Sequence, residues 1–288
     1  MRKMKMIKLE KPQFDQDKII EDCILNMRDG TGSPKERISA SKAEICRKSK
    51  GYDELAEEGR LSTLTQNTKI AGGATKDDMI KLYDNKFARK GEGGRPYYDA
   101  IKLLAPFGRC PFCGQRGVQT LDHYLPKAKF PVFAVTPFNL VPSCSDCNHD
   151  KLSETFNSYN EETIHPYYDD FTDAVWIKAK LIEENPITFE FYVDFPKEWE
   201  YIKYERAKNH FEKFNLNDLY KLQACEEFQG CFFRLKRLVE KGGKELAIEH
   251  LEESIEEKEH IRLNTWQAAM YDAIIQSDWF WDEYLPNQ

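Results

Sequence analysis

Four cysteines of the chain fall into two C-x-x-C pairs, Cys110 with Cys113 and Cys144 with Cys147, and 30 residues separate the pairs. A C-x-x-C turn places two thiolates at one edge of a tight turn, and two such turns complete a tetrahedral site for zinc. Gly114 follows the first pair, where this turn favours a residue without a Cβ atom. The spacing predicts a structural zinc, because four cysteines leave no open coordination position. The alternative is a chance pairing of buried cysteines.

The other four of the eight cysteines, Cys23, Cys46, Cys225 and Cys231, lack this spacing and are interpreted as core or surface thiols. The first 18 residues are basic and contain no apolar segment of the kind that a signal peptide requires. No apolar run approaches the roughly 18 residues of a membrane helix. We therefore expect a cytoplasmic protein without a membrane partner, in which paired cysteines indicate metal and not disulfides.

A second group of polar residues lies inside and just after the cysteine frame. Asp122 and His123 stand between the pairs, Asn139 comes shortly before the second pair, and Asn148 and His149 follow it. Each residue alone is a weak signal, since an Asp-His step is usually a surface feature and an Asn near a turn is usually a turn residue. Their joint order within a four-cysteine frame is a strong signal.

The order C-x-x-C, D-H-x-x-P, N-L-V and C-x-x-C-N-x-x-K resembles the HNH nuclease family over roughly residues 106–154. The resemblance implies a β-hairpin followed by a helix around one divalent metal. His123 would then be the general base, Asp122 and Asn148 the ligands of a catalytic Mg²⁺ or Mn²⁺, and Asn139 a support for the hairpin loop. His149 is the alternative ligand, because some members of the family carry a histidine on this helix.

These roles agree with the chemistry of phosphodiester hydrolysis. Imidazole titrates near neutral pH and suits a general base, and hard oxygen ligands suit Mg²⁺ or Mn²⁺. Asp122 and His123 cannot project alike from a regular strand. The resemblance implies that they lie at a strand end, where the chain bends, and Pro126 is consistent with such a break.

The formal net charge of −7 argues against a protein that coats nucleic acid, but the charge is uneven. From residue 86 to residue 129 there are nine basic and three acidic residues, which can focus a polyanion onto one site. A solvated face is the other interpretation. Arg109, Lys127 and Lys151 are the candidate contacts to nucleic acid, which we expect to be DNA, with RNA as the alternative.

The predicted fold class is α+β, with a zinc-stabilised ββα module set into a mainly helical chain. We expect a mostly helical region over 1–105, the nuclease module over 106–154 and a mainly helical region over 155–288. Helices are predicted over 15–27, 76–87, 97–104, 198–214, 216–240, 244–261 and 264–283, with breaks at Gly51, Gly72-Gly73 and Gly242-Gly243, and a strand over 187–193.

The longer phrases around both cysteine pairs resemble the HNH subunit of Septu-type anti-phage systems, which works with an ATPase partner. This resemblance implies a hetero-oligomer engaged in antiviral defence. The chain has no G-x-x-x-x-G-K-[ST] motif, so nucleotide-dependent control would require another protein. Two alternatives remain: helices that only scaffold a free-standing enzyme, and a zinc-stabilised module that binds without catalysis.

Two further segments have two interpretations each. The segment from His165 to Asp170 can supply metal ligands or simply cap the module. The aromatic C-terminal segment from Trp266 to Trp281 can form helical core or a partner surface.

Overall fold

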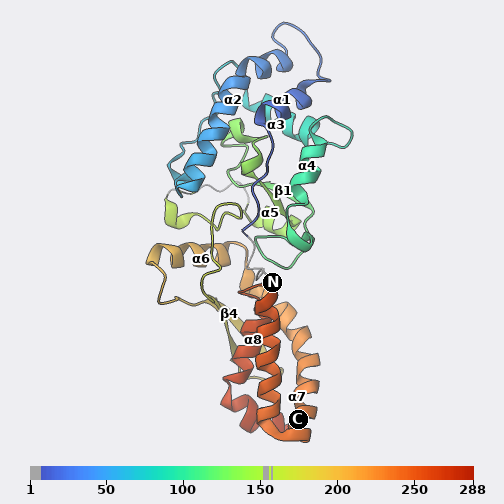
Figure 1. The fold of residues 1–288 in the computed structure, drawn as a ribbon, viewed down its shortest axis with the longest axis vertical. Helices are drawn as coiled ribbons and strands as arrows, with labels where there is room; N and C mark the ends of the chain where they lie inside the picture. The colour runs from blue at the N-terminus through green and yellow to red at the C-terminus, as the bar shows by residue number, and fades with distance from the viewer. Residues whose placement is uncertain (1–7, 152–155, 157) are drawn as a thin grey trace. The chain divides into compact units, whose positions relative to one another are not determined.

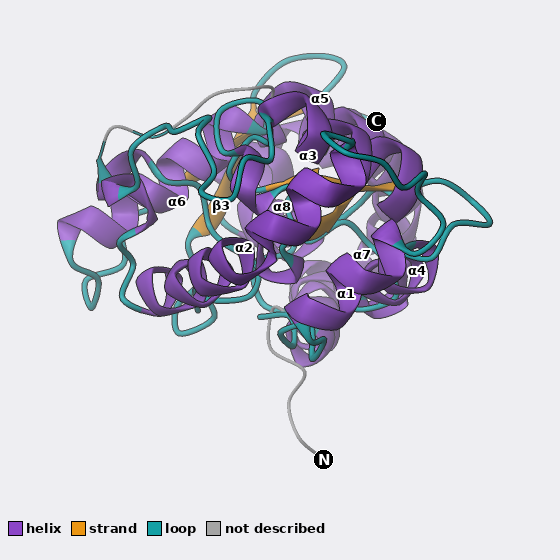
Figure 2. Cartoon of the chain, turned by 90° about the horizontal axis from the view of Figure 1, so that it is seen from above, coloured by secondary structure: helices purple, strands orange, loops and turns teal. Residues whose placement is uncertain are grey.

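The structure, a computed structural model, describes residues 8–151, 156 and 158–288 and divides them into two compact units. Residues 8–169 form the N-terminal unit, and residues 170–288 form the C-terminal unit. Helices dominate both, and the strands are few and short (Figure 2). The predicted α+β class is confirmed.

Besides short 3-10 and π turns, the described residues of the N-terminal unit form five α-helices and one two-stranded sheet. They are α1 (Gln16–Ile24), α2 (Pro34–Glu57), α3 (Lys76–Leu82), α4 (Arg95–Lys102), β1 (Thr120–His123), β2 (Leu140–Ser143) and α5 (Ser145–Lys151) (Figure 1). The side chains of Asp15, Ser33 and Thr75 cap the first turns of α1, α2 and α3 by accepting from backbone N–H groups there. The inner faces of α1 to α4 share one apolar core with Leu121 of β1 and Leu140 of β2.

The two short strands of this unit lie within the 30-residue segment that separates the cysteine pairs, and they pair antiparallel. Thr120 pairs with Ser143 at one end, and His123 pairs with Leu140 at the other. Helix α5 begins directly after β2 and packs against β1. The order of strand, strand and helix therefore brings the C-terminal end of β1 next to α5.

The C-terminal unit combines a β-hairpin with long helices: β3 (Ile177–Ile182), β4 (Thr188–Val193), α6 (Tyr201–Lys213), α7 (Leu216–Ile261) and α8 (Trp266–Ile275). Strand β4 buries Phe189 and Phe191, as its alternating pattern predicts. Helix α7 changes direction at Gly243, whose φ of 86° lies in the left-handed region that favours glycine.

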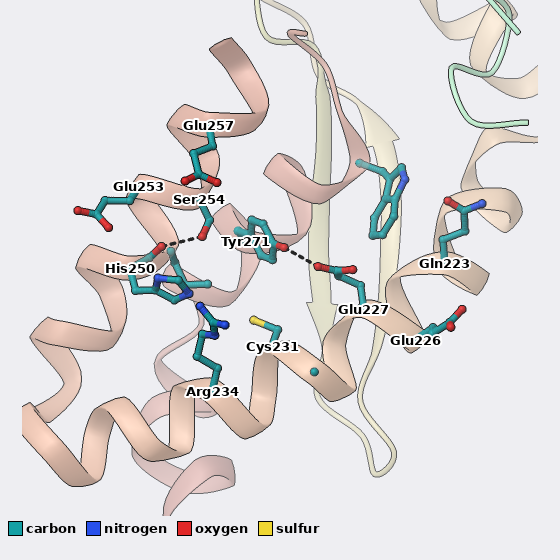
Figure 3. A pocket seen from close by; sticks show the side chains of 13 residues that line it. Gln223, Glu226, Glu227, Cys231, Arg234, His250, Glu253, Ser254, Glu257 and Tyr271 are labelled. Atoms are coloured by element: carbon teal, nitrogen blue, oxygen red, sulfur yellow. Dashed lines mark hydrogen bonds between the residues drawn. The ribbon is translucent and has the colours of Figure 1, made fainter. Parts of the chain in front are cut away.

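A polar cleft of about 800 Å³ opens between the two arms of α7 and α8 (Figure 3). Four glutamates line it, Glu226, Glu227, Glu253 and Glu257. Tyr271 also lines the cleft, and its hydroxyl donates a hydrogen bond to Glu227 at 2.7 Å. No other cluster of three or more metal-ligating side chains besides the four cysteines occurs in the described part of the chain.

The structure corrects three sequence expectations. Gly51 does not break α2, because tertiary packing on both sides outweighs the weak helix propensity of one glycine. The sequence predicts only the strand over 187–193, and the structure adds β3, whose Lys178 pairs with Asp272 at 3.1 Å. The last predicted helix ends at Ile275 and resumes as a π turn over Phe280–Tyr284.

The aromatic C-terminal segment forms core. Trp266, Met270, Ile274, Phe280 and Trp281 are all buried within the C-terminal unit. Among the described residues, no helix is both long and apolar enough to cross a membrane.

Candidate functional site

The four cysteines of the two C-x-x-C pairs meet in the N-terminal unit. Cys110, Cys113, Cys144 and Cys147 are all buried, and their sulfur atoms lie within 4.8 Å of one another. Four sulfur ligands at this spacing fit a single tetrahedral zinc ion. These residues can bind a metal ion such as zinc, as their spacing predicts.

Each pair closes through a hydrogen bond that a backbone N–H group donates. The N–H group of Gly114 donates to the carbonyl of Cys110 at 2.7 Å, and Gly114 has a φ of 67°, which explains glycine at this position. At the second pair, the N–H group of Cys147 donates to the sulfur of Cys144 at 3.4 Å. The turns therefore hold the thiols in position through the backbone.

The thiols also perturb one another's ionisation. The four sulfur atoms lie so close together that a thiolate at one of them raises the pKa of its neighbours. The group thus resists holding four thiolates by itself. A central cation removes that conflict, because metal binding releases the thiol protons.

Asp122, the penultimate residue of β1, is almost fully buried, with 4% of its surface exposed. Its nearest charge is Lys151 at the end of α5, whose Nζ lies 2.9 Å from Oδ2. The same ammonium donates to the His123 carbonyl at 2.6 Å. Oδ2 of Asp122 accepts no well-aligned hydrogen bond from any described residue. Burial raises the pKa of Asp122, although the ammonium acts in the opposite direction.

His123, the last residue of β1, is half-buried, and its Nε2 lies 2.9 Å from the carbonyl oxygen of Ala134. A carbonyl oxygen only accepts hydrogen bonds, so Nε2 carries the hydrogen and the Nδ1 lone pair is left to act as a base. Burial, and next the ammonium of Lys127, lower the pKa of His123 to about 3. The imidazole is therefore neutral at neutral pH.

Asn139 is fully buried and bridges the loop that follows β1. Its Nδ2 donates to the carbonyls of Leu125 and Phe133 at 3.0 and 3.2 Å, and its Oδ1 accepts from the Leu125 N–H group at 2.7 Å. The Asn139 carbonyl also accepts from the N–H group of Tyr124 at 2.8 Å. One side chain thereby fixes the backbone immediately after His123.

Helix α5 presents Asn148 and His149 differently. Asn148 is half-buried and lies three residues before Lys151, so it shares the helix face that meets Asp122. His149 is exposed. The position of Asp122 thus favours Asn148 over His149 as the second ligand of any ion bound there.

The three candidate nucleic-acid contacts lie in different surroundings. Lys127 is half-buried, pairs with Asp84 and lies 4.3 Å from the centroid of the Tyr83 ring. Arg109 is exposed and donates to the carbonyl of Gln115 in the first cysteine turn. Lys151 is buried, whereas a contact to phosphate requires an accessible ammonium.

The basic segment from residue 86 to residue 129 is neutralised in part by local ion pairs. Lys86 pairs with Glu92, Arg95 with Asp99 and Arg116 with Asp146 in the described structure.

His165 lies inside the N-terminal unit and not at an open metal site. It is buried, and its Nε2 lies 3.1 Å from the hydroxyl of Tyr52.

Sequence reasoning missed two partners of His123. The Tyr83 ring packs edge-on against the imidazole with a centroid distance of 4.3 Å, and the Ala134 carbonyl fixes the tautomer. Tyr83 is 40 residues upstream and reads as an ordinary apolar position of a helix face. A backbone carbonyl leaves no signal in the identity of its residue.

Comparison with known proteins finds similarity at two scales. Protein ea31 of Escherichia phage lambda is 32% identical over 254 residues, which cover 81% of this chain and 85% of that protein. Septu protein PtuB of Bacillus thuringiensis is 33% identical over 81 residues, which cover 26% of this chain and 31% of that protein. No family model matches the sequence, and no solved structure matches it.

Proposed function

This chain belongs to the family of protein ea31 of Escherichia phage lambda. Since that name states no activity, we propose the function of this chain from its candidate site. The protein is a metal-dependent endonuclease of the HNH type that hydrolyses phosphodiester bonds of nucleic acid. The observation that carries this proposal is the joint position of Asp122 and His123 at the end of β1, beside α5.

His123 is the general base of this proposal. Its Nδ1 takes a proton from the attacking water, the water oxygen bonds to phosphorus, and the bond from phosphorus to the leaving 3′-oxygen breaks. The Ala134 carbonyl and the Tyr83 ring orient the imidazole for this step. Asn139 is a positioning residue, since it fixes the loop after His123 and touches no reacting atom.

Asp122 and Asn148 would hold Mg²⁺ or Mn²⁺. The buried Oδ2 of Asp122, which pairs with Lys151 without an aligned hydrogen bond, and the amide oxygen on the adjacent face of α5 are hard donors that fit such an ion. When bound, the ion neutralises charge on the phosphate and on the leaving oxygen. The four-cysteine group is a separate, closed site, and its zinc stabilises the fold.

DNA is the proposed substrate, and RNA remains the alternative because a site that contacts one phosphate does not distinguish the sugars. The partial similarity to a Septu protein supports a role in anti-phage defence. The ATPase partner is proposed from the resemblance of the cysteine-pair segments to Septu subunits. Lys127 is the favoured contact to the substrate phosphate, since its side chain is partly exposed, pairs with Asp84 at the surface and carries a charge that acts on His123.

Replacing the general base tests the nuclease proposal. His123→Ala should lower the rate of plasmid cleavage in Mg²⁺ or Mn²⁺ by about 10²–10⁴-fold, the usual contribution of a general base. His260→Ala, which removes an exposed histidine of the C-terminal unit, is the control and should cleave normally. Single-stranded DNA and tRNA are assayed in parallel to separate the substrates. If wild-type protein binds nucleic acid but cleaves none of these, the non-catalytic binding module is the better description.

Co-expression tests the partner. Size-exclusion chromatography of this chain with the product of a neighbouring ATPase gene should show one complex that contains both proteins. A monodisperse, fully active monomer that retains no ATPase would contradict the partner and leave the nuclease proposal intact.

A further inference from the structure

Lys151 stands where a solvent-exposed lysine would be expected, at the end of a short surface helix, yet only 2% of its surface is exposed. Its ammonium lies 2.9 Å from Asp122 Oδ2, donates to the His123 carbonyl, and stands 5.7 Å from the centroid of the Tyr124 ring. The carboxylate, the carbonyl and the ring face are all electron-rich groups that attract a cation.

The ammonium fills this place imperfectly. Its bond at 2.6 Å goes to the carbonyl, whereas Asp122 Oδ2 lies 2.9 Å away without an aligned hydrogen bond. A buried carboxylate oxygen without an aligned hydrogen bond raises the free energy of the folded protein. The oxygen can therefore bind a second cation that is better placed. A divalent ion on Asp122 would stand within a few ångströms of the ammonium, where two positive charges in a partly dry site repel strongly.

We propose that Lys151 is a built-in cation that neutralises Asp122 in the metal-free protein and must withdraw when a divalent ion binds. The residue is thus a positioning residue that sets the metal affinity, and it is not a contact to the substrate phosphate. This inference rests on the proposed metal site at Asp122. It predicts weak metal affinity in the resting protein, since each bound ion must first displace the ammonium.

Metal titration of a charge-removing variant tests the inference. Lys151→Met keeps the length of the side chain and removes its charge. By calorimetry on zinc-loaded protein at pH 8, where protons compete least for Asp122, the Kd for Mn²⁺ should fall by about tenfold or more, because one repulsive charge is gone. Lys50→Met removes a solvent-exposed charge that pairs with Glu54 and not with Asp122, and it should change the Kd much less. Unchanged or weaker Mn²⁺ binding by folded Lys151→Met would overturn the inference.

A measurement on the wild-type protein covers the case in which Lys151→Met does not fold. Lysines are acetylated with a limiting amount of an amine-reactive reagent, and each site is quantified by mass spectrometry. Lys151 should react slowly in zinc-loaded, Mn²⁺-free protein and several-fold faster in saturating Mn²⁺. Lys50, with 81% of its side chain exposed, is the reference and should not change.

The outcomes separate the two proposals. Mn²⁺ binding with equal protection of Lys151 in its presence and absence contradicts this inference alone. If neither wild-type protein nor Lys151→Met binds Mn²⁺, both the inference and the proposed metal-dependent nuclease are wrong.

Discussion

At the scale of single residues, the site depends on buried polar side chains that satisfy backbone groups. Asn139 carries three hydrogen bonds to two neighbouring backbone segments and is fully buried. A buried donor or acceptor that loses its partner costs about 1–3 kcal/mol. The stability of the loop after His123 therefore depends on one amide.

Truncation of this amide should weaken both stability and catalysis. We expect Asn139→Ala to lower the free energy of unfolding of zinc-loaded protein by about 1–3 kcal/mol or more in urea titrations. Cleavage should fall as well, because His123 loses the support of its loop. Asn85→Ala, at an exposed helical position, should leave both quantities unchanged. An Asn139→Ala protein as stable as wild type would show that the loop holds without the amide.

The neighbouring residues Asn148 and His149 give a second prediction at this scale. Asn148→Ala should raise the Mg²⁺ concentration needed for half-maximal cleavage, because it removes an oxygen donor on the face beside Asp122. His149→Ala should have a mild effect, since its side chain is exposed. The opposite ranking would transfer the ligand role to His149. Metal-dependent cleavage curves for both variants decide the question.

At the scale of secondary-structure elements, α3 is fixed at its first turn by a buried ion pair. Asp78 has 4% of its surface exposed, receives hydrogen bonds from Arg37 of α2, and completes a capping box with Thr75. Burial alone would raise the pKa of Asp78, but the hydrogen bonds from Arg37 and Thr75 outweigh burial and lower it. The charged form thus stabilises the folded protein.

This pair predicts a pH-dependent stability. A carboxyl whose pKa is lowered by folding stabilises the protein above its unfolded pKa of about 4, and the stabilisation is lost as pH falls through the lower, folded value. Asp78→Asn should therefore be less stable than wild type at pH 7, by about 1–2 kcal/mol if only the capping interaction counts. The difference should shrink below pH 4. Asp77→Asn, at an exposed neighbour, should show no comparable difference at any pH in the same denaturant titrations.

At the scale of the whole molecule, two compact units differ in what holds them together. The N-terminal unit contains the four clustered cysteines, whereas the C-terminal unit packs aromatic side chains against long helices. All five tryptophans lie between residues 176 and 281, in the C-terminal unit. Tryptophan fluorescence therefore reports on that unit alone.

Removal of zinc should unfold one unit and spare the other. Structural zinc contributes about 10–16 kcal/mol of apparent binding energy in small domains, and this energy stabilises the fold. In Cys113→Ser, or after treatment with a strong chelator, the helical circular dichroism should decrease while the tryptophan emission maximum stays at its native wavelength. Cys46→Ser, which lies outside the cluster, should change neither signal. A simultaneous shift of both signals would mean that the units do not unfold independently.

The sequence alone was sufficient for the parts of this protein that depend on local spacing. The C-x-x-C pairs predicted the cysteine cluster because each turn is a local structure. Gly242-Gly243 predicted a break in the helix, and α7 changes direction there. The alternation over 187–193 predicted β4, because successive side chains of a strand point to opposite faces. The site residues Asp122, His123, Asn139 and Asn148 were chosen by motif, and their catalytic roles stay predictions.

Only the tertiary structure decided which groups surround those residues. Three contacts join segments that are 11 to 40 residues apart. Lys151 pairs with Asp122, the Tyr83 ring packs against His123, and the Ala134 carbonyl meets Nε2 of His123. Such contacts depend on how α3, β1 and α5 pack, and residue identity does not encode packing at that distance. Lys151, which the sequence offers as a phosphate contact, is buried in the structure and pairs with Asp122.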